Sequence, residues 1–405
     1  MKHERDLKDL SSLISEKDLV KLLSDLVSLP SYPGIPAQET AVAEYILQYF
    51  EKAGIEAEVE TVDQGRKNVY ARLPGSGGGR TLLLNGHTDT VPPYDMPEPL
   101  SPRIKGRRLY GRGTSDMKGA LACMMTAMKL LKQTGIRTKG DLIFSGVIDE
   151  ELTSLGTRAL LKKGIKADGA VVGEPTGLTI GMGHKGLQWF QFDVHGRAVH
   201  GGNQEMGINA IRSASLLIQR IEEQLIPRLK YRIHPIIGRS SVNYGFIQGG
   251  FQPSTVAGEC VLQIDRRWIP GETYEEVTAE FEEILHELRR DYPDFSCDFS
   301  VMEKSIMEEG ILHEGFEIDP AHPLVHTAEE AAFQATGRRA EKGSFKAWSD
   351  GGLLSSYGGI PTIILGPGDL SCAHTDQEYL DIDQAMEFVM IYMFIGMHFC
   401  GREGS

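Results

Sequence analysis

The chain has 405 residues, of which 41% are hydrophobic and 24% are charged, and its formal net charge is −14. This length allows two domains with buried cores, and the composition is ordinary for a globular protein. The negative charge argues against a nucleic-acid partner or an anionic membrane, because both would need a basic surface.

The five cysteines are widely scattered, and none of them forms a CxxC pair. An odd, scattered set is typical of reduced thiols in a cytosol. Residues 1–6 are charged and lack an apolar segment, so no secretory signal is expected. The most apolar segment, residues 385–400, is shorter than a bilayer span and contains Glu387 and His398, which favours a core helix. We therefore expect a cytoplasmic protein.

The first part of the chain alternates helical patterns with apolar strands. Ser15 begins a capping box, and apolar residues then repeat at helical spacing up to Pro30. Further helices are predicted over 38–52, 117–132 and 155–163, and strands over 55–62, 67–73, 81–86, 141–148 and 169–173. This alternation predicts an α/β layered domain with a mostly parallel sheet.

From about residue 183 the pattern changes to βαββαβ, the ferredoxin-like order. The six elements are predicted over 185–196, 207–225, 241–248, 255–266, 274–290 and 295–302. A helix at 323–336, a strand at 360–365 and a last helix then return to α/β character. We therefore predict a larger domain of residues 1–182 and 303–405, with an inserted small domain of residues 183–302.

Histidine and acidic residues follow several of the apolar strands. His87 and Asp89 come directly after strand 81–86, and residues two apart in an extended chain share one face. A metal-binding imidazole whose other nitrogen is held by a carboxylate would fit this pair. A simple hydrogen-bonded His–Asp pair fits the stretch equally well.

The same pattern recurs at other strand ends. Glu150 and Glu151 follow strand 141–148, Glu174 follows strand 169–173, and His374 follows a Gly-Pro-Gly turn. Asp116 directly precedes a helix, where an ordinary N-cap is the alternative. Together these residues form a plausible two-metal set, which needs a bridging carboxylate. Because neighbouring residues cannot both point at one metal, one of the adjacent glutamates would bind metal and the other would act as general base.

Five runs carry a resemblance to a known family: Gly86–Pro92, Gly111–Gly119, Asp149–Glu151, Gly173–Thr176 and Ala373–Thr375. They resemble the dinuclear zinc hydrolases that include acetylornithine deacetylase, succinyl-diaminopimelate desuccinylase, aminoacylase and carboxypeptidase G. The resemblance covers nearly the whole chain in consistent order. It implies a zinc-peptidase-like catalytic domain with an inserted dimerisation lid, and therefore a homodimer.

The resemblance also implies a role for each residue. Asp116 would bridge two Zn²⁺ ions per subunit, for which Co²⁺ could substitute. His87 and Glu174 would complete one site, and Glu151 and His374 the other. Asp89 would orient His87, and Glu150 would be the general base.

The inserted domain carries further matches. The Gly-x-x-x-His run that ends at His200 matches a family motif, which implies that His200 stabilises the oxyanion in a partner's active site. Whether it acts there or in its own subunit is open. Arg267 matches a position that binds a substrate carboxylate, with a salt bridge inside the lid as the alternative. Where the family usually has Asn, this chain has Ser254, and Ala257 replaces a proline.

The turn from Gly366 to Gly368 offers backbone N–H groups to a substrate carboxylate, or is merely a tight turn. The sequence thus predicts a zinc-dependent hydrolase that removes an N-acyl group from a small amino-acid-like molecule. The alternatives are an N-formyl-amine deformylase, a dipeptidase or carboxypeptidase, and, remotely, a non-catalytic binding protein.

Overall fold

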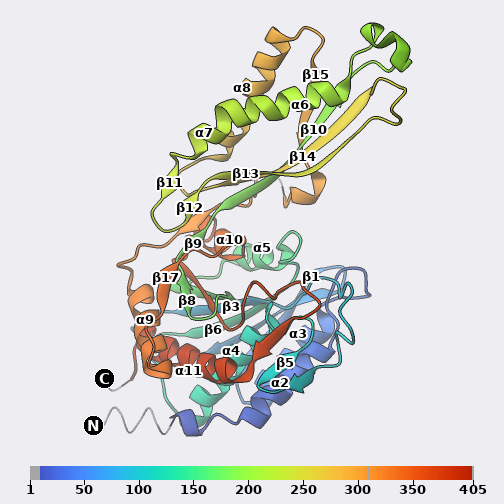
Figure 1. The fold of residues 1–405 in the computed structure, drawn as a ribbon. Coiled ribbons are helices and arrows are strands. Elements are labelled where there is room, and N and C mark those ends of the chain that lie inside the picture. Colours follow the sequence, from blue (N-terminus) through green and yellow to red (C-terminus); the bar gives the residue numbers. More distant parts are fainter. Residues whose placement is uncertain (1–9, 309, 404–405) are drawn as a thin grey trace. The chain divides into compact units, whose positions relative to one another are not determined.

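The computed structural model describes residues 10–308 and 310–403 and divides the chain into two compact units (Figure 1). Unit 1 comprises residues 1–183, 317–345 and 349–405, and unit 2 comprises residues 184–316 and 346–348. The charged start of the chain, residues 1–6, lies outside the described residues.

The division differs from the expected one after residue 302, because residues 303–316 pack with unit 2. Leu187 donates from its backbone to the His313 carbonyl at 2.9 Å, and Gln188 Nε2 donates to the Ser305 carbonyl at 3.1 Å.

Unit 1 contains an eight-stranded sheet in the order β1-β2-β6-β3-β7-β18-β8-β17. Its strands are β1 (Glu56–Asp63), β2 (Arg66–Leu73), β3 (Leu82–His87), β6 (Leu142–Val147), β7 (Gly169–Pro175), β8 (Thr179–Gly181), β17 (Glu341–Gly343) and β18 (Thr362–Gly366). The four neighbours β6, β3, β7 and β18 run parallel, so their carboxyl ends lie at one edge of the sheet.

Helices cover both faces of this sheet. Figure 1 shows α4 (Lys118–Thr134) and α11 (Ile382–Phe399) on one face, with α5 (Leu155–Lys162) and α10 (Gly351–Ser356) on the other. The remaining helices of unit 1 are α2 (Glu16–Ser28), α3 (Thr40–Lys52) and α9 (Pro323–Thr336). Most of α11 is buried, as expected for a core helix. Among the described residues, no helix has both the length and the apolar character that crossing a membrane requires.

Several small elements were not predicted from the sequence. A three-stranded sheet joins β4 (Arg103–Lys105), β5 (Arg108–Tyr110) and β19 (Tyr379–Asp381), which are far apart in the chain. Short pairs are formed by β9 (Gly183–His184) with β16 (Phe316–Glu317), and by β11 (Ile233–His234) with β12 (Gly238–Arg239). Strands of two or three residues are too short to show the alternation of apolar and polar residues by which a strand is recognised in a sequence.

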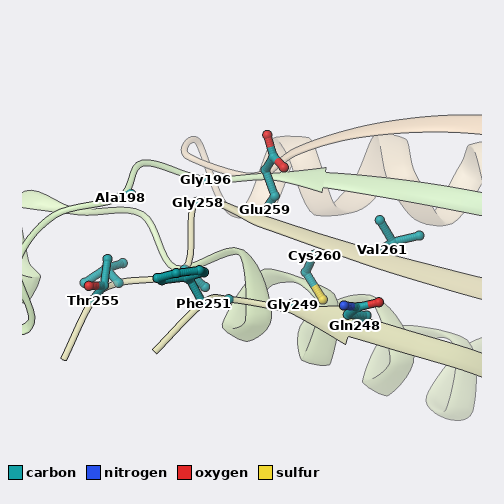
Figure 2. Close-up of a pocket in the computed structure, with 13 residues that line it drawn as sticks. Gly196, Ala198, Gln248, Gly249, Phe251, Thr255, Gly258, Glu259, Cys260 and Val261 are labelled. Carbon is teal, nitrogen blue, oxygen red and sulfur yellow. The ribbon is translucent and has the colours of Figure 1, made fainter. Parts of the chain in front are cut away.

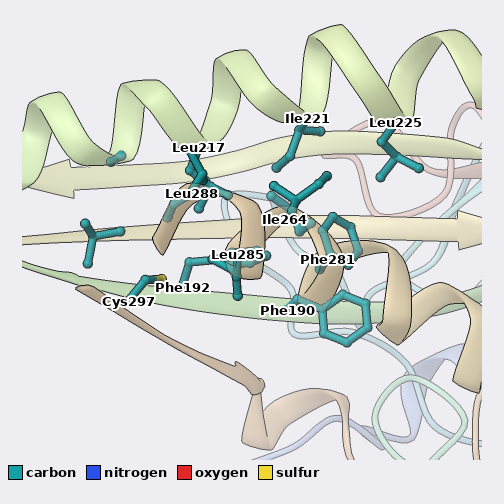
Figure 3. Packing of buried hydrophobic residues seen from close by; sticks show 14 of the residues in the cluster. Phe190, Phe192, Leu217, Ile221, Leu225, Ile264, Phe281, Leu285, Leu288 and Cys297 are labelled. Atoms are coloured by element: carbon teal, nitrogen blue, oxygen red, sulfur yellow. The ribbon is translucent and has the colours of Figure 1, made fainter. Parts of the chain in front are cut away.

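Unit 2 has the βαββαβ order that the sequence predicts. Its antiparallel sheet runs β13-β14-β10-β15, formed by β10 (Gly186–His195), β13 (Ser241–Gly249), β14 (Glu259–Trp268) and β15 (Ser296–Val301). Two helices, α6 (Ala210–Arg220) and α8 (Tyr274–Asp291), pack on it, and α7 (Ile226–Leu229) follows α6. Figure 3 shows their shared core, where Phe190 and Phe192 of β10 meet Leu217 of α6 and Phe281 of α8.

Strand β14 begins four residues later than predicted. Residues 250–258 form a loop, in which Gly250 has a φ of +73° and Pro253 cannot donate a ladder hydrogen bond.

Candidate metal centre and active site

The parallel strands of unit 1 bring the predicted metal-binding residues to one edge of the sheet. His87 is the last residue of β3, Glu150 and Glu151 follow β6, and Glu174 lies near the end of β7. Asp116 lies just before α4, and His374 lies in the loop between β18 and β19. In α/β proteins, functional polar residues are commonly found at the carboxyl ends of the strands, because the loops there can carry them.

His87 is fully enclosed, and both of its ring nitrogens have partners. Nδ1 lies 3.0 Å from the Asp89 carbonyl oxygen, which can only accept, so Nδ1 carries a proton. Nε2 lies 3.0 Å from Asp116 Oδ1 and 3.7 Å from Glu174 Oε1. Burial opposes protonation, but the bonds to Asp116 and Asp89 raise the pKa of His87 well above its usual value. Nε2 faces the carboxylates and would be the metal-binding nitrogen once its proton is displaced, while Nδ1 keeps its proton.

The Asp116 carboxylate lies between two imidazoles. Its second oxygen, Oδ2, is 3.2 Å from His374 Nε2, and the same nitrogen is 3.2 Å from Glu151 Oε1. The bonds to Asp116 and Glu151 raise the pKa of His374 to about 10. Burial raises the pKa of Asp116, but the hydrogen bonds from His374 and His87 outweigh it and the pKa is lowered. Each oxygen of one carboxylate thus faces a different histidine, which is the arrangement that a bridging ligand needs.

Asp89 holds the adjacent glutamates as well as His87. Its carboxylate accepts the backbone N–H of Glu150 at 3.2 Å and that of Glu151 at 3.0 Å. The carboxylate is 3.5 Å from His87 Nδ1, so the shorter contact to the imidazole comes from the Asp89 backbone. Asp89 therefore holds the ends of both β3 and β6. The sequence predicted only that it would orient His87.

Three glutamate carboxylates crowd this site beside Asp116. Burial, followed by the charge of Glu174, raises the pKa of Glu150, and burial with the charge of Asp116 raises the pKa of Glu151 and Glu174. Glu174 Oε1 is buried and has no hydrogen-bond partner. A buried, unpartnered carboxylate oxygen costs free energy that a cation would recover.

The donor set fits divalent cations. The ligand atoms of His87, Asp116 and Glu151 all lie within 4.8 Å of one another, and so do those of His87, Glu150 and Glu174. Imidazole nitrogen with carboxylate oxygen is a common environment for Zn²⁺ and related ions. The second group brings Glu150 close enough to bind metal itself, beside its expected role as general base.

Two buried arginines beside this site were not predicted from the sequence. Arg112 Nη1 donates to Glu378 Oε2 at 2.6 Å, and Glu378 Oε1 accepts the backbone N–H groups of Ser115 (3.0 Å) and Asp116 (3.1 Å). Arg66 donates hydrogen bonds to Glu39 and to Asp149, which directly precedes the adjacent glutamates. An arginine at the start of a strand or in a glycine-rich loop usually faces solvent, so only the ion pairs with residues far along the chain distinguish these two.

Unit 2 brings His200 and Ser254 onto neighbouring loops. The Ser254 carbonyl accepts the backbone N–H of Gly201 at 2.7 Å. The backbone N–H of Gly202 donates to His200 Nδ1 at 3.1 Å, so the proton of the neutral imidazole lies on the exposed Nε2. Beside these loops is an open groove of about 650 Å³ (Figure 2), lined by residues that include Ala198, Phe251 and Thr255.

The other predicted substrate residues have partners within the chain. Arg267 Nε donates to Asp265 Oδ2 at 3.0 Å, which is the lid salt bridge that was the alternative. Gly366 donates its N–H to Thr176 Oγ1 at 3.3 Å and Gly368 to Gln384 Oε1 at 2.7 Å. A Cβ at Gly366 would lie 2.0 Å from the Gly173 carbonyl oxygen. These contacts favour the tight turn over a site that offers N–H groups to a substrate.

Comparison with known proteins places the chain in a family. The profile of peptidase family M20/M25/M40 matches residues 83–395, a span that contains every strand-end residue named above. The chain belongs to this family. Members of peptidase family M20 are hydrolases of amide bonds, and this protein is therefore an amide hydrolase with the fold that the sequence predicted.

Individual relatives agree with this assignment. The chain is 32% identical to the N-formyl-4-amino-5-aminomethyl-2-methylpyrimidine deformylase of Halalkalibacterium halodurans, over 95% of each chain. It is 30% identical to the acetylornithine deacetylase of Myxococcus xanthus, over 94% of this chain and 97% of that protein. The crystal structure of aminopeptidase PepT from Bacillus cereus superposes with a TM-score of 0.79 and 22% identity, covering 96% of this chain and 100% of that one. At this identity the last likeness concerns the fold alone.

Proposed function

We propose that this M20 hydrolase uses two divalent cations to remove a short acyl group from the nitrogen of a small molecule. The observation that carries the proposal is the position of Asp116, whose two oxygens lie 3.0 Å from His87 Nε2 and 3.2 Å from His374 Nε2. One carboxylate between two imidazoles is the core of a dinuclear centre.

The ligands divide around Asp116. His87 and Glu174 would hold one cation, and Glu151 and His374 the other, with Zn²⁺ as the proposed metal and Co²⁺ as a substitute. When bound, the cations would lower the pKa of the attacking water and act as a Lewis acid toward the amide carbonyl. Their positive charge would also relieve the repulsion that raises the pKa of Glu150, Glu151 and Glu174.

Glu150 is proposed as the general base. Its backbone is fixed by the bond to Asp89, and its side chain is half-buried among the metal-binding groups. It would take a proton from the attacking water and return the proton to the leaving amine nitrogen. The Asp89 contact thus places both a ligand, Glu151, and the base on one turn.

His200 is proposed to stabilise the oxyanion of the tetrahedral intermediate. The bond from Gly202 to Nδ1 leaves an N–H on the exposed Nε2, and a fixed donor of this kind is what a developing alkoxide needs. We further propose that the protein is a cytoplasmic homodimer in which His200 serves the partner's site. Strand β13 supports this, because it lies at the edge of the unit 2 sheet and exposes Phe246 and Ile247.

The leading substrate class is an N-formyl amine. A named deformylase, from Halalkalibacterium halodurans, matches 95% of the chain at 32% identity. A second candidate is an N-acyl amino acid, which Arg267 favours. In the described residues, only Nε of this guanidinium donates to Asp265, so its two terminal nitrogens remain for a substrate carboxylate.

A release assay separates these candidates. The metal-free protein is loaded with Zn²⁺ or Co²⁺ and supplied with N-formyl, N-acetyl and N-succinyl compounds and with dipeptides. The amine moiety is varied between an aminomethylpyrimidine and an amino acid. Turnover restricted to formyl compounds supports the first candidate, and turnover of acyl amino acids supports the second. No hydrolysis of any compound by fully loaded protein would refute the proposed function.

A further inference from the structure

A buried triad of charges includes Asp149, the residue directly before the adjacent glutamates of the active site. We call Glu39, Arg66 and Asp149 the Arg66 triad. Arg66 Nε donates to Glu39 Oε2 at 2.9 Å, and its Nη2 donates to Glu39 Oε1 at 2.5 Å and to Asp149 Oδ1 at 2.7 Å. The three residues are 0%, 8% and 2% exposed, respectively.

Asp149 organises the turn that carries the glutamates, which we call the acidic turn (residues 149–154). Its Oδ2 accepts the hydroxyl of Thr153 at 2.6 Å and the backbone N–H of the same residue at 3.2 Å. Its backbone carbonyl accepts the N–H of Ser154 at 2.6 Å, and its own φ is +69°. Asp149 thus closes the turn with both its side chain and its backbone.

The acidic turn is therefore held from two strands. Asp89, after β3, bonds to the backbone of Glu150 and Glu151, and Arg66, in β2, bonds to the side chain of Asp149. Two adjacent glutamates that face other carboxylates repel one another, and a free turn would rotate them toward water. The bond from Arg66 to Asp149 opposes that rotation.

Fold stability alone does not account for this triad. Burying charges is costly, and an apolar replacement of a buried ion pair is often as stable. Glu39 accepts two of the three hydrogen bonds that the Arg66 side chain donates, so a purely structural arginine would need only Glu39. The third bond, to Asp149, points to the active site.

We propose that Arg66 is a positioning residue, which holds the acidic turn so that Glu151 binds metal and Glu150 faces the reacting water. This inference rests on the proposed function. Loss of a hydrogen-bond partner of a metal ligand typically reduces affinity or activity by about 10–100-fold. Arg66 acts on the ligand Glu151 only through Asp149 and the turn, so we expect the lower end of this range, about 10-fold, in the affinity of one of the two metal sites and in kcat, with little change in KM.

The test compares three variants of the full chain. Arg66→Met removes the cation, and Arg66→Met/Glu39→Gln removes the cation together with the acid that it neutralises. Arg72→Met is the matched control, because Arg72 lies on the same strand but is largely exposed and pairs with Asp141. Metal-free proteins are titrated with Co²⁺, followed by visible absorption and calorimetry. Thermal unfolding and steady-state kinetics are measured on the same samples.

The double variant separates positioning from structure. If Arg66 positions the turn, the double variant should unfold near the parent temperature. It should still bind Co²⁺ more weakly than the parent at one of the two sites, and it should still have a reduced kcat. Parent-like cobalt binding and kcat in a folded double variant would overturn the proposal. If neither Arg66 variant folds, Asp149→Asn tests the same bond with Arg66 present, and unchanged cobalt binding there would also overturn it. Cobalt binding needs no substrate, so a failure of the proposed reaction would leave this test intact.

Discussion

Removing the carboxylate of Glu378 should destabilise unit 1 far more than removing a surface carboxylate with the same contact distance. Glu378 and Arg112 are 2.6 Å apart, and each side chain is 1% exposed. Glu387 and Arg338 are also 2.6 Å apart, but their side chains are 31% and 59% exposed. The two pairs therefore share a contact distance but differ in burial, and Glu378→Ala and Glu387→Ala form a matched comparison.

The expected magnitudes follow from that burial. Breaking a buried ion pair by removing one partner costs about 3–5 kcal/mol, because a buried charge is left without compensation. Glu378 also accepts the backbone N–H groups of Ser115 and Asp116, and each buried donor left unbonded costs about 1–3 kcal/mol unless water enters. Since water can re-bond the two N–H groups, the ion pair sets the lower bound, and we expect a loss of at least about 3 kcal/mol for Glu378→Ala. For the exposed pair we expect about 0.2–1 kcal/mol.

Urea unfolding followed by two probes measures these losses. The three tryptophans, Trp189, Trp268 and Trp348, all belong to unit 2, whereas far-ultraviolet circular dichroism reports both units. Because two units can unfold separately, the dichroism transition should shift for Glu378→Ala while the fluorescence transition shifts less. Equal dichroism shifts in the two variants, or a loss below about 1 kcal/mol for Glu378→Ala, would refute the reasoning.

Three further outcomes are expected. Glu150→Gln should keep both cations in metal analysis but lose about 10²–10⁴-fold in kcat, and turnover near that of the parent would exclude Glu150 as the base. His200→Ala should lose about 10²–10³-fold in kcat with an unchanged mass in light scattering, and a change in mass alone would assign His200 to the interface. Burial, with the charges of His184 and Arg267, lowers the pKa of His313 from 6.5 to about 4. The unfolded chain therefore binds the His313 proton more readily, so the contribution of His313 to stability should be constant above pH 6.5 and fall by up to about 3 kcal/mol as the pH drops to 4. His313→Gln should flatten this loss in unfolding measured against pH, and an unaltered profile would contradict the assignment.

The strand-end residues could be found from the sequence because each one follows a readable pattern. An apolar run marks β3, β6 or β7, and the polar residue that interrupts it, such as His87 or Glu174, lies at the carboxyl end. Parallel strands then bring these ends together, so a local pattern and one rule of topology predict a shared site.

The residues that hold the ligands in place have no such pattern. Glu378 lies 262 positions from the backbone N–H of Asp116 that it accepts, and Arg66 lies 83 positions from Asp149. Neither arginine interrupts an apolar run, and a charged residue near a strand end usually faces solvent. The start of β14 was misplaced for a different reason, because the apolar residues Val256 and Ala257 are buried in a loop and resemble a strand.

The two buried arginines explain how this edge of the sheet can present so many acids. Arg112, through Glu378, fixes the backbone at Asp116, and Arg66, through Asp149, fixes the acidic turn. Four of the five proposed ligands have side chains at most 9% exposed, whereas His374, on a loop with a φ of +62°, is 48% exposed. The cation between His87 and Glu174 would therefore sit in a site formed in advance by the sheet. The other site depends on Glu151 and His374, so its affinity follows from how firmly the acidic turn and one loop are held.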